Sequence, residues 1–93
     1  MINETQQRLV QICDSAKKTV IEKNKRYGNS ALEPINIFSK LDAKEGIRQR
    51  LDDKLKRVKS STEHRKNDTF DLIGYLILYC EANDWIDFSD QLD

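Results

Sequence analysis

The stretch from Arg50 to Cys80 limits the possible folds of this chain more than any other part of the sequence. At about 100° per residue, its first half and the turn before it form an apolar stripe with a charged stripe directly beside it. The apolar stripe comprises Ile47, Leu51, Leu55 and Val58, and the charged stripe comprises Arg50, Asp53, Lys54 and Arg57. An ordinary surface helix carries its charges opposite its apolar face. Charges that flank the apolar face therefore indicate a helix that meets a second polar surface.

The second half of this stretch repeats the arrangement. One face carries Phe70, Ile73, Ile77 and Cys80, and its neighbour carries Asp68, Asp71, Tyr75 and Tyr79. Roughly eight residues join the two predicted helices, a length that favours antiparallel neighbours. We therefore predict an antiparallel pair whose facing polar side chains form a charged seam with three pairings, namely Arg57 with Asp68, Lys54 with Asp71, and Arg50 with Tyr75.

The whole chain is predicted to be a single all-α domain, because 93 residues leave no room for a second one. The expected segments of residues 1–93 are a helix at about 3–26, a connector at 28–42, helices at about 43–59 and 67–83, and an acidic aromatic tail at 84–93. Gly28 would end the first helix, and Ser39 or Asp42 would cap the second. The connector would cover one end of the core with Ile35, Ile37, Phe38 and Leu41.

The helix at 67–83 is expected to lie at the centre of a small bundle of about three main helices. It is apolar over most of its circumference, because Leu72, Leu76 and Leu78 lie outside its main apolar face. Two other helices cannot cover such a helix completely in so small a chain. We therefore predict a homo-oligomer, a dimer or a dimer of dimers, that buries Leu76, Leu78 or the region around Trp85.

Positive and negative charges are segregated along the chain although the formal net charge is zero. Residues 1–66 contain all 16 Lys and Arg and nine acids, whereas residues 67–93 contain seven acids and no base. This pattern suggests an anionic ligand, a tail that docks on the chain itself, or a charge-paired oligomer. Nucleic-acid binding is not expected, because the bases of residues 40–66 lie on mixed stripes without a recognition-helix pattern.

The location expected from the sequence is the cytoplasm. No signal peptide precedes the first predicted helix, and the apolar run from Leu72 to Cys80 is too short to span a bilayer. Cys13 and Cys80 each fall on an apolar helix face and are interpreted as buried reduced thiols. We therefore expect a soluble intracellular protein without a membrane partner.

The segment KNKRYGNS, at residues 23–30, is a candidate phosphate-contacting loop. Lys23 and Tyr27 precede Gly28, and Ser30 follows it, so backbone and hydroxyl donors lie close to basic side chains. The alternative is a helix C-terminus whose dipole favours cations.

The charged seam offers the groups that a nucleotide site needs. Lys54 is flanked by Arg50 and Arg57, and the guanidinium fork suits phosphate oxygens. Tyr75 adds a flat surface on which a base can stack. No catalytic residue is predicted, because His64 is the only histidine and the chain has no Walker loop or GxGxxG fingerprint.

Three carboxylates of the seam are candidate metal ligands. Asp68 and Asp71 are one helical turn apart, and Asp53 on the facing helix would complete a three-oxygen pocket for Mg²⁺. The alternative is an ion network in which these acids only neutralise the neighbouring bases.

Three motifs in order resemble small phage-encoded proteins of the nucleotide modification-associated domain type. They are YGxS, RLxDKxxR and DTxxDLxxY, carried by Tyr27, Gly28 and Ser30, by Arg50, Asp53, Lys54 and Arg57, and by Asp68, Thr69, Asp71, Leu72 and Tyr75. The likeness covers about residues 20–80. It implies a nucleotide ligand and a phage or prophage source, and hence the cytoplasm of a bacterial host.

The chain is more distantly similar to the MazG-like all-α nucleotide pyrophosphohydrolases, which bind Mg²⁺ through an ExxE pair and an ExxD pair on neighbouring helices. Asp68 and Asp71 match the second pair, whereas the first pair is missing, because Asp52 and Asp53 point about 100° apart. This likeness implies a MazG-like bundle rather than a coiled coil, with a site that holds phosphates well and activates water poorly. Phage proteins that sequester immune signalling nucleotides as an anti-defence function fit that description. The alternatives are a Mg²⁺-dependent pyrophosphohydrolase and a structural or adaptor protein.

Overall fold

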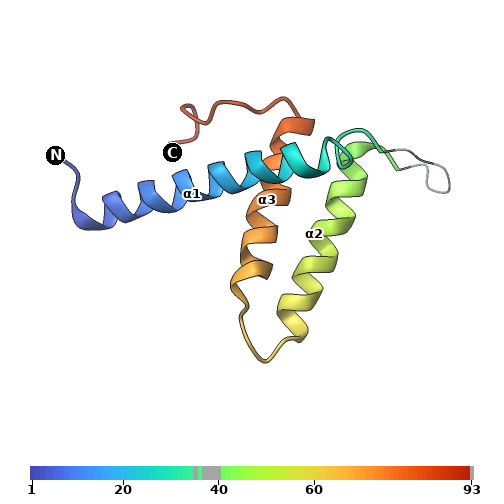
Figure 1. The fold of residues 1–93 in the computed structure, drawn as a ribbon, viewed down its shortest axis with the longest axis horizontal. Helices are drawn as coiled ribbons and strands as arrows, with labels where there is room; N and C mark the ends of the chain where they lie inside the picture. The colour runs from blue at the N-terminus through green and yellow to red at the C-terminus, as the bar shows by residue number, and fades with distance from the viewer. Residues whose placement is uncertain (35, 37–40, 93) are drawn as a thin grey trace.

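The computed structural model describes residues 1–34, 36 and 41–92, and this part of the chain folds into three α-helices (Figure 1). They are α1 (Glu4–Tyr27), α2 (Ala43–Ser60) and α3 (Lys66–Ala82). Within these residues no β-strand forms. The predicted all-α class is confirmed, and each helix begins and ends within one residue of its predicted bounds.

Helix α1 has well-defined caps at both ends. The Asn3 side chain accepts a hydrogen bond from the Gln6 N–H at 2.8 Å, and the Gln6 side chain accepts one from the Asn3 N–H at 2.9 Å. This reciprocal capping box satisfies two donors that the first turn leaves unpaired. At the other end the Gly28 N–H donates to the Asn24 carbonyl at 2.7 Å, so the helix ends at the predicted glycine.

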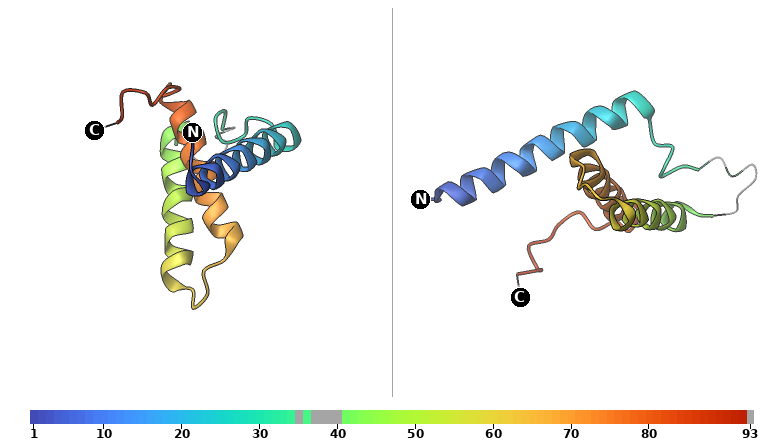
Figure 2. Two further views of the ribbon diagram at one scale, coloured as in Figure 1. Left: turned by 90° about the vertical axis from the view of Figure 1, so that its left-hand side faces the viewer. Right: turned by 90° about the horizontal axis from the view of Figure 1, so that it is seen from below.

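Helices α2 and α3 form the predicted antiparallel hairpin and lie side by side in Figures 1 and 2. Asp42 caps α2 by accepting a hydrogen bond from the Glu45 N–H at 2.8 Å, as one of the two predicted caps. Ile47 faces α3 and is fully buried. The other candidate cap, Ser39, and the connector residues at 35, 37 and 38 lie outside the described residues.

Helix α3 has the predicted central place, because within the described part of the chain it contacts both other helices. Helix α1 crosses α3 instead of running along it, and its N-terminal half extends beyond the hairpin (Figures 1 and 2). The radius of gyration is 15.3 Å, whereas a compact chain of this length would have about 12 Å. The single chain is therefore more extended than an ordinary domain of its size.

The tail after α3 is anchored at its first residues. The Trp85 ring packs edge-on against Tyr79, with 6.0 Å between ring centroids, and the backbone N–H of Trp85 donates to the Cys80 carbonyl at 2.9 Å. Arg48 of α2 holds Tyr79 in turn, by a 2.8 Å hydrogen bond from Nε to the phenol oxygen. Beyond Trp85, the apolar side chains of Ile86 and Phe88 are exposed.

The described helices bury few apolar side chains. Ile47 is the one hydrophobic side chain among the described residues that is fully buried, and Leu76 of α3 is half exposed. None of these helices is both long and apolar enough to cross a membrane.

Candidate functional site

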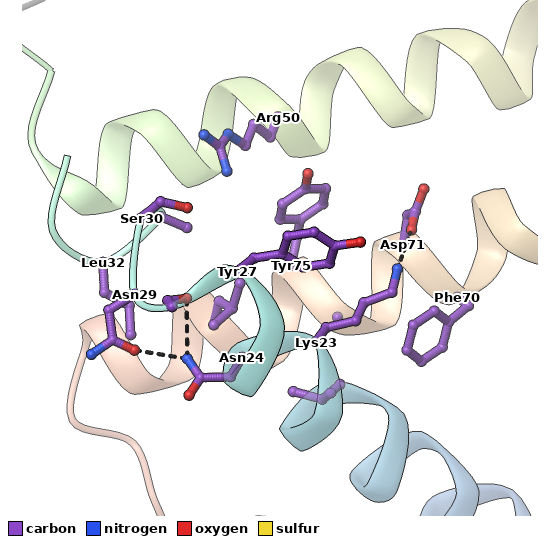
Figure 3. Close-up of a pocket in the computed structure, with 15 residues that line it drawn as sticks. Lys23, Asn24, Tyr27, Asn29, Ser30, Leu32, Arg50, Phe70, Asp71 and Tyr75 are labelled. Carbon is purple, nitrogen blue, oxygen red and sulfur yellow. Dashed lines mark hydrogen bonds and ion pairs between the residues drawn. The ribbon is translucent and has the colours of Figure 1, made fainter. Parts of the chain in front are cut away.

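A cavity of about 270 Å³ opens where the C-terminal end of α1 and the loop after it meet the α2–α3 hairpin (Figure 3). Arg50 reaches it from α2, Lys23 from α1, and Tyr75 from α3. We call it the inter-helix cavity. Its lining comprises Val20, Lys23, Asn24, Tyr27, Gly28, Asn29, Ser30, Ala31, Leu32, Arg50, Phe70, Asp71, Gly74, Tyr75 and Leu78.

The loop that closes one side of the cavity is tied to α1 by side-chain hydrogen bonds. Asn24 Nδ2 donates to Asn29 Oδ1 at 2.7 Å and to the Gly28 carbonyl at 3.3 Å (Figure 3). The Asn29 carbonyl then accepts hydrogen bonds from the N–H groups of Leu32 and Glu33, at 2.9 and 2.8 Å. These contacts hold the turn that carries Ser30 at the rim of the cavity.

Gly28 has a backbone conformation that residues other than glycine rarely adopt. Its φ is 67° and its ψ is −158°, a region that is essentially restricted to glycine and is strained by about 1–3 kcal/mol in other residues. An added Cβ would meet no atom within 4 Å, so the strain would come from the backbone alone. Glycine at this position therefore sets the direction in which the chain leaves α1.

We expect Gly28→Ala to lower the free energy of unfolding by about 1–3 kcal/mol in urea titrations, because of this backbone strain. Gly46→Ala in α2 is the matched control, since a Cβ there also meets nothing within 4 Å. In a helix the same replacement should stabilise by about 0.5–1 kcal/mol. Equal stability of Gly28→Ala and the unmodified chain would contradict this role of the glycine.

Asp71 lies between two lysines from different helices. Lys54 Nζ of α2 is 2.8 Å from Asp71 Oδ2, and Lys23 Nζ of α1 is 3.7 Å from Asp71 Oδ1. The Lys54 and Asp71 side chains are only 16% and 22% exposed, whereas Lys23 is 53% exposed. The predicted pairing of Lys54 with Asp71 is therefore confirmed. Lys23 is held more loosely and also lies over the Phe70 ring, 5.1 Å from its centroid.

The predicted pairing of Arg50 with Tyr75 is also confirmed. The guanidinium carbon lies 5.8 Å from the centroid of the Tyr75 ring, within the range of a cation–π contact. Both side chains line the cavity, and Arg50 is exposed. Tyr27 of α1 lines the same cavity (Figure 3).

The third predicted pairing, Arg57 with Asp68, does not form an ion pair. No basic nitrogen among the described residues lies within 4.0 Å of the Asp68 carboxylate. Asp68 is only 6% exposed in the first turn of α3, whereas Arg57 is exposed in the last turn of α2. Both residues lie at the loop end of the hairpin, where solvation of the long arginine side chain competes with a contact to the buried acid.

Some of the predicted ligand residues line the inter-helix cavity, and others lie outside its lining. Six of them line the inter-helix cavity, namely Lys23, Tyr27, Gly28, Ser30, Arg50 and Tyr75. Lys54 lies outside the lining but holds Asp71, which belongs to it. Arg57 does not line the cavity.

The three candidate metal ligands are not gathered at one point. Asp71 lines the cavity and is bonded to Lys54, Asp68 is buried, and Asp53 is exposed. Within the described ranges, no group of three or more His, Cys, Asp or Glu side chains is arranged to hold a metal ion. The three-oxygen pocket expected from the sequence is therefore not seen in this arrangement of helices.

Sequence reasoning missed two residues of the site. Asn24 ties the loop to α1 through Asn29, which the sequence had placed in the phosphate-contacting loop, and Phe70 supports Lys23. Asn24 had a local signal, because it lies one turn before the helix-ending glycine. Phe70 had none, since its position on the apolar face of α3 predicts only a core side chain.

Among the described residues, the two groups with shifted pKa values lie outside the cavity. Hydrogen bonds to Tyr79 and to Glu45 raise the pKa of Arg48. Hydrogen bonds from the backbone and hydroxyl of Ser89 lower the pKa of Asp87. These groups stabilise the tail and its attachment and take no part in the site.

Comparison with protein-family models, with curated proteins and with solved structures finds no significant match to this chain. The assignment of a function therefore depends on the geometry of the inter-helix cavity.

Proposed function

We propose that the inter-helix cavity binds a phosphate-bearing nucleotide and holds it without cleaving it. The observation that carries this proposal is the meeting of two cations and three aromatic rings, from all three helices, around one cavity. The cations are Lys23 and Arg50, and the rings are Tyr27, Phe70 and Tyr75.

The charge balance of the cavity favours an anion. Asp71 is the acidic residue in the lining, and Lys54 already neutralises it at 2.8 Å. The charges of Lys23 and Arg50 are therefore available to a ligand. At 3.7 Å from Asp71, Lys23 is beyond the usual 2.7–3.2 Å of a hydrogen bond, so a phosphate oxygen can recruit it at little energetic cost.

The aromatic rings and the size of the cavity favour a nucleotide over a free phosphate. Tyr75 and Tyr27 present flat faces on which a base can stack. The cavity volume of about 270 Å³ is close to the lower end of the range for small-molecule sites, about 300–1,000 Å³. This supports a ligand, or a ligand portion, of mononucleotide size. Asn29 and Ser30 at the rim add polar groups that can orient it.

The pairing of Asp71 supports binding without cleavage. Metal-assisted hydrolysis needs free carboxylates to hold the ion that activates water, and here the acid nearest the ligand is bonded to a lysine. A site with this balance suits a phage or prophage protein that sequesters immune signalling nucleotides.

The test is incubation with linear and cyclic mono- and dinucleotides in the presence of Mg²⁺, removal of unbound ligand, denaturation and chromatography. We expect one phosphate-bearing nucleotide to be retained and released intact. Recovery of a cleaved nucleotide would show a hydrolase instead, and no retention of any nucleotide would remove the proposed function.

A further inference from the structure

The face of α1 that covers the inter-helix cavity continues toward the N-terminus, where its apolar side chains are exposed. Ala16 and Val20 are partly buried. One and two turns earlier, on the same side of the helix, Ile12 is 57% exposed and Leu9 is 55% exposed. Cys13 lies beside them and is exposed as well, so its predicted burial is wrong for the single chain, because this part of α1 projects beyond the hairpin. We call Leu9, Ile12 and Cys13 the α1 apolar surface.

The exposed area of the whole chain shows how much surface lacks a cover. A compact monomer of 10.9 kDa would expose about 5,600 Å², whereas this chain exposes 8240 Å². The excess is roughly 2,600 Å². Obligate homodimers bury about 2,000–5,000 Å² in total, or roughly half of that on each chain. The excess lies just above the area that such an interface removes from one chain, roughly 1,000–2,500 Å², so one dimer interface would account for most of it.

The charge distribution favours a second copy of this chain as the partner. Each copy is neutral, with a balance of +7 in residues 1–66 and −7 in residues 67–93. Two copies related by a two-fold axis can place the acidic tail of each near the basic helices of the other. The exposed Ile86 and Phe88 of the tail add apolar surface for the same contact.

We propose that a second copy of this chain packs on the α1 apolar surface to form a two-fold dimer. This contact covers the half of α1 that projects beyond the hairpin (Figure 1). It is independent of the proposed ligand, because Leu9, Ile12 and Cys13 do not line the inter-helix cavity.

Light scattering at micromolar protein concentration tests the proposal directly. The unmodified chain should have twice the chain mass of 10.9 kDa. Ile12→Glu places a charge in the interface and should raise the dimer dissociation constant by 100-fold or more, so that the mass falls to that of one chain. Glutamate is a good helix former, so circular dichroism should show α1 intact.

Gln11→Glu is the matched control, because it adds the same charge outside the α1 apolar surface, about 100° from Ile12 and about 160° from Leu9 and Cys13 around the helix. This variant should keep the mass of two chains. A single-chain mass for the unmodified protein, or a two-chain mass for Ile12→Glu, would overturn the proposal.

Alkylation of Cys13 gives a second measurement that needs no variant. In the unmodified protein, Cys13 should react more slowly at high protein concentration, where the dimer covers it, than after dilution. Mass spectrometry distinguishes this label from one on Cys80. The same rate of Cys13 labelling at both concentrations would also overturn the proposal.

Discussion

Arg50→Ala is expected to weaken nucleotide binding by about 1.5–3 kcal/mol, the usual value of a hydrogen bond between charged groups. This corresponds to a dissociation constant roughly 10- to 150-fold higher. Fold stability should change by less than about 1 kcal/mol, because Arg50 is exposed and a surface cation–π contact contributes about 0.5–1 kcal/mol. Calorimetric titration with the retained nucleotide measures the first quantity, and urea unfolding measures the second.

Arg57→Ala is the matched control for this variant. It removes the same side chain from the same helix, two turns further on, at a position outside the cavity lining. Binding by Arg57→Ala should therefore stay within about twofold of the unmodified protein, apart from a small loss of long-range attraction. If both variants weaken binding equally, the ligand contacts the hairpin elsewhere and the inter-helix cavity is not its site.

Lys54→Ala is expected to destabilise the fold by about 2–3 kcal/mol, because it leaves the partly buried Asp71 without its closest partner. Removing one partner of a fully buried ion pair lowers the stability of a fold by about 3–5 kcal/mol. Here Asp71 keeps 22% exposure, and Lys23 at 3.7 Å can move closer. For a domain of this size the melting temperature should fall by roughly 10–20 °C, measured by circular dichroism at one fixed protein concentration.

Two further variants show whether the loss comes from the stranded acid. Lys56→Ala removes an exposed lysine of the same helix and should change stability by less than about 0.5 kcal/mol. Asp71→Asn added to Lys54→Ala removes the uncompensated charge and should restore part of the lost stability. A Lys54→Ala protein that melts at the temperature of the unmodified chain would contradict the structural role of the pair.

The helices and two seam contacts could be predicted because local rules determine them. Gly28 marks the end of α1 and Asp42 the start of α2 by cap chemistry. The short connection between α2 and α3 fixes an antiparallel register, which brings Lys54 to Asp71 and Arg50 to Tyr75. Each of these features depends on residues within a few turns of one hairpin.

The cavity as a whole could not be predicted, because it depends on the angle at which α1 crosses α3. In sequence, the loop at 28–30 and the seam are two separate candidate sites. The crossing joins them by placing Lys23, Tyr27 and Tyr75 around one cavity (Figure 3). It also gives Phe70 a polar neighbour, which the apolar periodicity of α3 did not indicate.

The small contact between α1 and the hairpin has a consequence for how the molecule opens. Local unfolding begins where the fewest apolar contacts hold the chain together. Here α1 packs against α3 only where the two helices cross, and its backbone does not approach that of α2 within the described residues. Helix α1 can therefore separate while α2 and α3 remain paired. The inter-helix cavity lies where α1 meets the hairpin. A bound molecule would therefore hold together two units that otherwise separate at little cost in free energy.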